Sequence, residues 1–284
     1  PVEEVVITGV PPLKWVLYAR QILSEGVDES WAVYDKDNHP KHEEAFLEAN
    51  KEIDGKKVNI AFSSRSFEYY LLLHFEYIYY RFDETECGEK IRGKKHIFEC
   101  GTGKNPEKDC GGRICINGYA RKRGYWLETK SSESTFPLVK DNLIKGMVNA
   151  CRLRAESDAR TKEPVYKRNP YTNADILVGR LIGKDTVGYG NSFMYNERGH
   201  NWSVRFYEDI LNIANNKNGS EYFSKDMIVI YNYEEKSEHE LYEKSLLLQS
   251  NESKQLPCKL EQNQVILVKV SPGKEVLLLP KFII

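Results

Sequence analysis

Residues 31–40, WAVYDKDNHP, combine a short apolar run with two aspartates placed where the run ends. The run Trp31–Tyr34 predicts a β-strand, and because strand side chains alternate with a period of two, Asp35 and Asp37 are expected on the same side. Two carboxylates at this spacing can share one divalent cation, Mg²⁺ or Mn²⁺. The alternative is that Asp37 caps the helix that follows.

The segments around this stretch alternate between strand and helix patterns. They comprise an apolar run Val5–Thr8, a helix from Pro12 to Gly26, a helix from Pro40 to Gly55, a strand Val58–Phe62 and a helix Ser66–Phe82. Such alternation predicts an α/β fold with a parallel sheet covered by helices on both faces. Ligands of such sheets collect at the carboxyl ends of the strands, where both aspartates lie.

The rest of the chain predicts an insertion and an appendage. Residues 83–125 are rich in Gly, Lys and Cys without a sustained period, which indicates an insertion. Helices are expected at 136–156, before Gly183 and at 202–214, a loop at 186–201, and strands at 227–233, 265–270 and 276–279. The predicted domains are therefore residues 1–185, with 83–125 inserted, and a small α+β domain over 186–284.

Composition favours a soluble globular protein. The chain has 284 residues, of which 40% are hydrophobic, enough for a full core and about two domains. The longest apolar stretch, Tyr69–Phe82, is interrupted by charged residues and is too short to cross a bilayer. We therefore expect no membrane contact and a cytoplasmic location.

The formal net charge of -1 hides a basic segment. Residues 88–125 contain ten Lys or Arg and four Asp or Glu, which is the footprint of a phosphate-backbone contact or of a solvated lysine-rich loop. Aromatic residues flank the basic triplet Arg121, Lys122 and Arg123, a combination suited to a nucleic-acid strand. The cations Lys167 and Arg168 either contact substrate as well or define a turn.

Four of the six cysteines fall in or near this basic segment. They are Cys87, Cys100, Cys110 and Cys115. Structural zinc sites usually contain one close pair, and the spacing of Cys110 and Cys115 is just within that range. The sequence leaves open a Zn²⁺ site and free thiols.

Three motifs together resemble the RloB-like family. They are DKDNH at 35–39, SSRSFEYYLLLHF at 63–75 and YKRNPYTN at 166–173, in the family's order. The family belongs to the wider Toprim group of metal-dependent nucleic-acid enzymes. The resemblance spans residues 1 to about 183 and implies a Toprim-like fold, nuclease activity on DNA or RNA, a role in prokaryotic defence against phage, and an ATPase partner.

One departure from the family pattern concerns a third acid. RloB-like proteins normally end their first strand with a catalytic glutamate in a Glu-Gly turn, whereas here the first run ends Ile7-Thr8-Gly9. Either the glutamate precedes the chain shown or it has been lost. The first case preserves a nuclease, and the second leaves a module that binds without cutting.

Two further residues are candidates for the same site. Glu68 would lie in the first turn after the third predicted strand, as a third metal ligand, as a residue that orients water, or only as an acid favoured by the helix dipole. His74 would position substrate, or it is a core histidine within an apolar helix.

Two hypotheses about function follow. The first is an Mg²⁺-dependent nuclease with Asp35, Asp37, Glu68 and His74 as its catalytic residues. The second is a non-catalytic module that binds nucleic acid or docks onto the ATPase. Residues 186–284 lie outside the resemblance, and a partner contact or a homo-oligomer surface is expected there.

Overall fold

The structure, a computed structural model, describes residues 10–37, 39–86, 115–126 and 132–282. The chain divides into two compact units between Asp175 and Ile176, earlier than the boundary at residue 185 expected from the sequence. The expected first strand, Val5–Thr8, lies outside the described residues.

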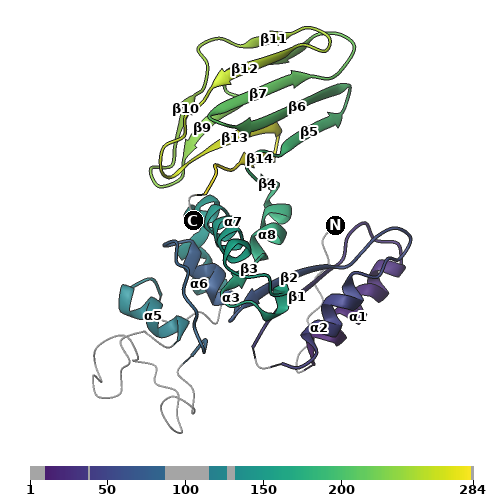
Figure 1. Ribbon diagram of the computed structural model, residues 1–284, viewed down its shortest axis with the longest axis vertical. Helices are drawn as coiled ribbons and strands as arrows, with labels where there is room; N and C mark the ends of the chain where they lie inside the picture. The colour runs from purple at the N-terminus through teal and green to yellow at the C-terminus, as the bar shows by residue number, and fades with distance from the viewer. Residues whose placement is uncertain (1–9, 38, 87–114, 127–131, 283–284) are drawn as a thin grey trace. The chain divides into compact units, whose positions relative to one another are not determined.

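The first unit contains helices and one small sheet (Figure 1). Its elements are α1 (Pro12–Ser24), β1 (Trp31–Asp35), α2 (His42–Ala49), β2 (Asn59–Ser64), α3 (Phe67–Leu73), α5 (Ile116–Arg123), α6 (Ser132–Val139), η1 (Lys140–Asn142), α7 (Leu143–Arg160), η2 (Val165–Lys167) and β3 (Tyr171–Thr172), with α8 (Ala174–Ile182) beginning at the boundary.

The sheet of this unit has the order β1-β2-β3 and mixed direction. β1 and β2 are parallel, with Trp31 opposite Asn59 and Asp35 opposite Ser63, whereas β3 pairs antiparallel with β2. The expectation of a Toprim-like parallel sheet flanked by helices was wrong. Within the described residues, β1 and β2 form the parallel strand pair of this unit, Glu84 and Cys115 add an isolated parallel bridge, and most strand pairs are antiparallel.

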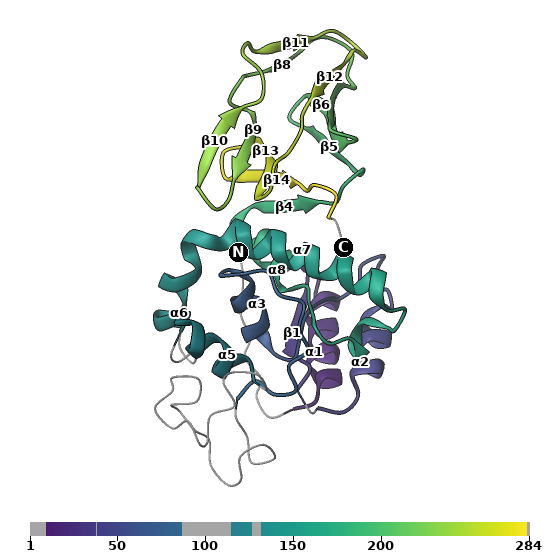
Figure 2. The ribbon, with the colours of Figure 1, turned by 60° about the vertical axis from the view of Figure 1, so that its left-hand side comes forward.

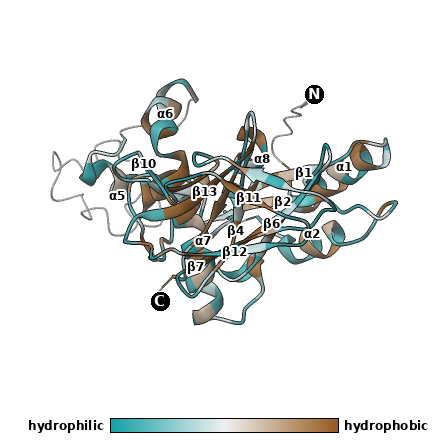
Figure 3. Ribbon diagram, turned by 90° about the horizontal axis from the view of Figure 1, so that it is seen from above, coloured by the Kyte–Doolittle hydropathy of each residue, from teal (hydrophilic) through white to brown (hydrophobic). Residues whose placement is uncertain are grey.

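One face of this sheet packs against α1 and α2, which lie side by side (Figure 1). Alternate strand residues, among them Ala32, Tyr34 and Phe62, enter this core together with Val16 and Ala45 of the helices. Both helices carry apolar and polar residues on different sides, as half-buried helices do (Figure 3). Since Tyr34 points into this core, its neighbour Asp35 points to the opposite face.

Helix α3 ends at Leu73, although the sequence predicted a helix as far as Phe82. The segment that follows is rich in aromatic residues, which have modest helix propensity, and it packs instead on α7, the long helix of this unit (Figure 2). The guanidinium of Arg152 lies 3.9 Å from the centre of the Tyr77 ring, and that of Arg160 lies 4.5 Å from the centre of the Tyr79 ring.

The second unit is a β-domain rather than the expected α+β appendage. Its strands are β4 (Lys184–Val187), β5 (Ser192–Glu197), β6 (His200–Tyr207), β7 (Ile210–Asn215), β8 (Glu221–Phe223), β9 (Ile228–Asn232), β10 (Ser237–Glu240), β11 (Leu246–Leu248), β12 (Ser253–Pro257), β13 (Gln264–Ser271) and β14 (Lys274–Leu278). The sheet orders are β10-β9-β13-β14-β4, β12-β7-β6-β5 and β11-β8. The two larger sheets share one apolar core, to which Val204, Ile213, Ile266 and Val276 contribute.

Residues 202–214, predicted as a helix, form the hairpin β6–β7 instead. Trp202, Val204 and Phe206 are buried with a period of two, which is strand periodicity. Glu208 and Asp209 both have positive φ angles, of 50° and 55°, as the central residues of a two-residue hairpin turn require. The expected loop at 186–201 likewise contains β5. The expected strands at 227–233, 265–270 and 276–279 correspond to β9, β13 and β14.

In the part of the chain that the structure describes, no helix is both long enough and apolar enough to span a membrane.

The contact between α3 and α7 yields a prediction at Gly146. A Cβ atom at this position would lie 2.6 Å from Nε2 of the buried His74 ring, so Gly146→Ala forces the two helices apart. We expect a loss of about 1–3 kcal/mol in the free energy of unfolding, measured by denaturant titration. Gly188→Ala is the control, because its Cβ would meet only the flexible Asn191 side chain, at 3.3 Å. Equal stability of the two variants would contradict this packing.

Candidate active site

The loops that leave β1 and β2 run side by side at the carboxyl ends of the two strands. The backbone N–H of Lys36 donates to the carbonyl of Ser63 over 2.9 Å, which continues the strand pairing by one residue. The Arg65 Nη1 group donates to the carbonyl of Asp37 over 3.0 Å. These bonds hold the acidic motif of the first loop against the start of α3.

Asp35 is half-buried at the end of β1, and its carboxylate accepts a hydrogen bond from the backbone N–H of Phe67. Burial, together with the nearby charges of Glu68 and Asp37, raises the pKa of this carboxyl group to about 8, while the Phe67 amide opposes the shift. The structure therefore brings together three of the predicted catalytic residues as one electrostatically coupled group.

Asp37 lies beyond the strand, in a turn. Its φ angle of 34° is in the left-handed region, which aspartate tolerates better than most residues. The strand alternation that suggested a shared side for the two aspartates thus ends at Asp35, and the turn brings the exposed Asp37 within electrostatic range instead. Glu68 reaches the group from the first turn of α3, where it is half-buried.

The acidic group of Asp35, Asp37 and Glu68 is the candidate site for a divalent cation. Among the described residues, no set of three His, Cys, Asp or Glu side chains is arranged to hold a metal ion. Mg²⁺ commonly takes only one or two protein carboxylates and keeps water and substrate oxygens as its other ligands. Asp35 and Asp37 fit that lower requirement, because the mutual repulsion that raises the Asp35 pKa is what a bound cation would remove.

Two supporting residues were missed by the sequence analysis. Lys36 Nζ donates to the backbone carbonyls of Lys167 and Arg168, over 2.7 and 3.2 Å, and so ties the acidic loop to a distant turn. His42 Nε2 bonds the carbonyl of Lys36 over 2.7 Å. Lys36 stood within the DKDNH motif, but nothing in the sequence signals that the left-handed φ of 68° at Lys41 turns His42 back onto it.

The far side of β2 is held by a buried polar network. Ser63 Oγ and Thr172 Oγ1 lie 2.8 Å apart and join β2 to β3. Arg154 donates from Nη1 to the carbonyl of Thr172 over 2.9 Å and pairs with the fully buried Asp175. This network fixes the strand that carries the Ser63-Ser64-Arg65 loop.

His74 lies away from solvent in the core between α3 and α7. Its ring is 1% exposed, its Nδ1 lies 3.0 Å from the carbonyl of Tyr70, and burial lowers its pKa to about 4. A neutral, buried ring packed on Gly146 has the surroundings of a core histidine.

The predicted basic residues lie in two places. In α5, Arg121 is buried and pairs with Glu86 at 3.1 Å, Lys122 is exposed, and Arg123 pairs with Glu76 while stacking on Tyr119. Of this triplet, Lys122 and Arg123 are exposed and Arg121 is not.

Lys167 and Arg168 belong to the turn whose carbonyls hold Lys36. The Arg168 side chain donates to the Glu163 carbonyl over 2.8 Å and pairs with Asp158. This second pair therefore borders the acidic loop through its backbone.

Three residues of the predicted zinc set, Cys87, Cys100 and Cys110, lie outside the described residues. The fourth, Cys115, is buried at the start of α5.

Comparison with known proteins identifies a family for the first unit. A model of the family described as RloB-like protein matches residues 7–181, more than half of the chain. Searches of curated proteins and of solved structures find no match.

The raised pKa of Asp35 makes stability depend on pH in a defined direction. The folded chain holds this proton more tightly than the unfolded chain, whose pKa is near 3.8, so stability is lost as pH rises from about 4 to about 8. Asp35→Asn removes that loss. We expect the variant to melt at least about 2–4 °C above the wild type at pH 8.5, with a smaller difference at pH 5.5, in thermal unfolding.

The exposed Asp28→Asn serves as the control and should show no such pH dependence. A stabilisation of Asp35→Asn that is the same at both pH values would argue against a buried, repelled carboxyl group.

Proposed function

This chain belongs to the RloB-like family, and from that premise we propose that it is a metal-dependent nuclease that hydrolyses phosphodiester bonds of DNA or RNA in prokaryotic defence against phage. The observation that carries the proposal is the position of Asp35 at the end of β1, where its carboxylate binds the Phe67 N–H and where burial and the charges of Glu68 and Asp37 raise its pKa. Such clustering destabilises the free protein and is typical of functional sites.

The three carboxylates have two roles in the proposed reaction, metal binding and proton transfer. Asp35 and Asp37 would hold Mg²⁺ or Mn²⁺ from the end of β1 and the turn after it. The ion would supply charge stabilisation on the phosphate oxygens and acidify a water. Glu68, coupled electrostatically to Asp35, would orient the attacking water and accept its proton. The Phe67 amide would keep the Asp35 carboxylate aimed at the site.

A partner ATPase is part of the same proposal, because the family resemblance implies one. The basic residues of α5 and of the 167–168 turn would contact the nucleic acid. Lys122 and Lys167 are exposed members of this set.

A second candidate function is a non-catalytic nucleic-acid-binding or ATPase-docking module. One observation favours it: among the described residues, no three potential ligands are arranged around a common point. In that case the three acids would be remnants of a degenerate site.

Cleavage assays with the full chain separate the two functions. Purified protein is incubated with Mg²⁺ or Mn²⁺ and a panel of single-stranded DNA, duplex DNA, RNA and tRNA. We expect cleavage that Asp35→Asn reduces roughly 100-fold or more, because the substitution removes a metal ligand. Asp28→Asn should cleave like the wild type. Absence of metal-dependent cleavage from the whole panel would favour the binding module.

Metal binding itself gives an independent readout. Added Mg²⁺ should raise the melting temperature of the wild type at pH 8.5, where Asp35 is ionised, and should do so less at pH 6, where a proton competes with the ion. Asp35→Asn should lose this response. An equal Mg²⁺ response in the variant would place the ion elsewhere.

A further inference from the structure

An aromatic side chain stands exposed at the edge of the acidic group. The Phe67 ring is 40% exposed, although the backbone N–H of the same residue donates to the Asp35 carboxylate. Its inner side packs against the Tyr70 ring, with 5.7 Å between ring centres. Single exposed apolar residues are common on protein surfaces, but this one is anchored by Tyr70, and its own backbone N–H holds a proposed metal ligand.

Three cations lie around the same group. Arg65 bonds the carbonyl of Asp37, and Lys36 is held at the carbonyls of Lys167 and Arg168. Arg81 lies 3.4 Å from the Asp83 carboxylate, on a segment whose Phe82 carbonyl is bonded by Asn169 of that same turn. Cationic side chains at the edge of a site can hold the phosphates of a bound strand.

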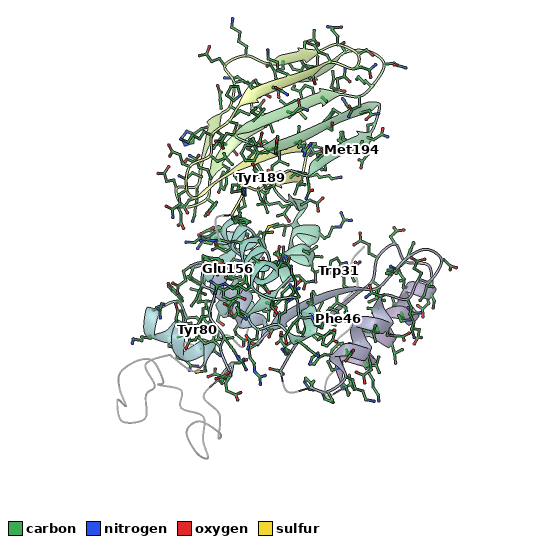
Figure 4. All side chains as sticks on the ribbon, viewed as in Figure 1. Trp31, Phe46, Tyr80, Glu156, Tyr189 and Met194 are labelled. Atoms are coloured by element: carbon green, nitrogen blue, oxygen red, sulfur yellow. The ribbon has the colours of Figure 1, made fainter. Side chains whose placement is uncertain are left out.

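The chain segment that carries Arg81 is fixed to the site at two points. Asn169 Nδ2 donates to the carbonyl of Phe82 over 2.9 Å, from the turn that also holds Lys36. The Arg65 guanidinium lies 3.6 Å from the Glu84 carboxylate. Between these anchors and α3 the segment presents Tyr80, which is 43% exposed, beside an Arg81 side chain that is 74% exposed (Figure 4).

We propose that this rim binds an unpaired polynucleotide strand, with one base stacked on Phe67 and the neighbouring phosphates held by Lys36, Arg65 and Arg81. This deepens the proposed function by naming its substrate class, and it rests on that function only for the cleavage step. A ring can stack on a base only if the base is free of its own neighbours, which favours loops and single strands over a duplex. Tyr80 offers a second ring, next to Arg81, for a further base.

Binding is measured separately from cleavage. Fluorescence anisotropy of labelled single-stranded DNA, single-stranded RNA and duplex DNA is followed with the Asp35→Asn chain in the absence of divalent ions. We expect single strands to bind about tenfold or more tightly than the duplex. Adding Phe67→Ala or Phe67→Leu should weaken single-strand binding about tenfold, while Phe67→Trp should preserve it, because only an aromatic ring offers a stacking face.

Two variants in the second unit are matched controls. Tyr222→Ala removes an aromatic ring that is 61% exposed, and should leave binding unchanged.

Arg81→Gln should lower affinity and reduce the slope of log affinity against log salt by about one. Lys225→Gln, which removes a half-exposed cation paired with Glu240, should change neither.

The outcomes separate this inference from the proposed function. Suppose that the protein cleaves in a metal-dependent way and that its Phe67 variants bind and cut single strands and duplexes like the wild type. This result would overturn the inference but not the proposed nuclease activity. Binding of single strands that depends on Phe67, without cleavage of any substrate, would support the inference and overturn the nuclease. Equal affinity for duplex and single strands would also overturn the inference.

Discussion

The candidate site depends on the parallel pairing of β1 and β2. This register sets Asp35 opposite Ser63 and lets the Lys36 amide bond the Ser63 carbonyl, so that the loops leaving both strands run together. Phe67 can then donate its N–H to the Asp35 carboxylate, and Glu68 follows in the first turn of α3. A shift by one residue would turn Asp35 toward the core under α1 and α2 and separate the acids.

Much of the surrounding structure supports this one edge. His42 and Lys36 fix the acidic loop, and the network of Ser63, Thr172 and Arg154 fixes β2 from its other side. These contacts hold in place the half-buried Asp35, whose pKa is raised by burial and by the charges of Glu68 and Asp37.

Local sequence patterns predicted the secondary structure correctly where it depends on residues close together in the chain. Proline at the start of α1, apolar periodicity in α1, and the β-rich runs that became β9 and β13 were all readable. Local patterns gave wrong predictions where contacts between residues far apart in the chain override local preferences. The aromatic run after Leu73 packs on α7 and does not extend α3. Residues 202–214 were predicted as a helix, but a turn at Glu208 and Asp209 folds them into two paired strands.

The sequence by itself determined the family and the acidic motif, because both are carried by residue types in a fixed order along the chain. Only the tertiary structure decided which candidates share a site. Asp35, Asp37 and Glu68 meet because hydrogen bonds link residues that are about thirty positions apart, whereas His74, which directly follows the helix of Glu68, packs against Gly146 of α7. The tertiary structure also decided whether strands pair parallel or antiparallel, because this depends on the partner that each strand meets in space and not on its own composition.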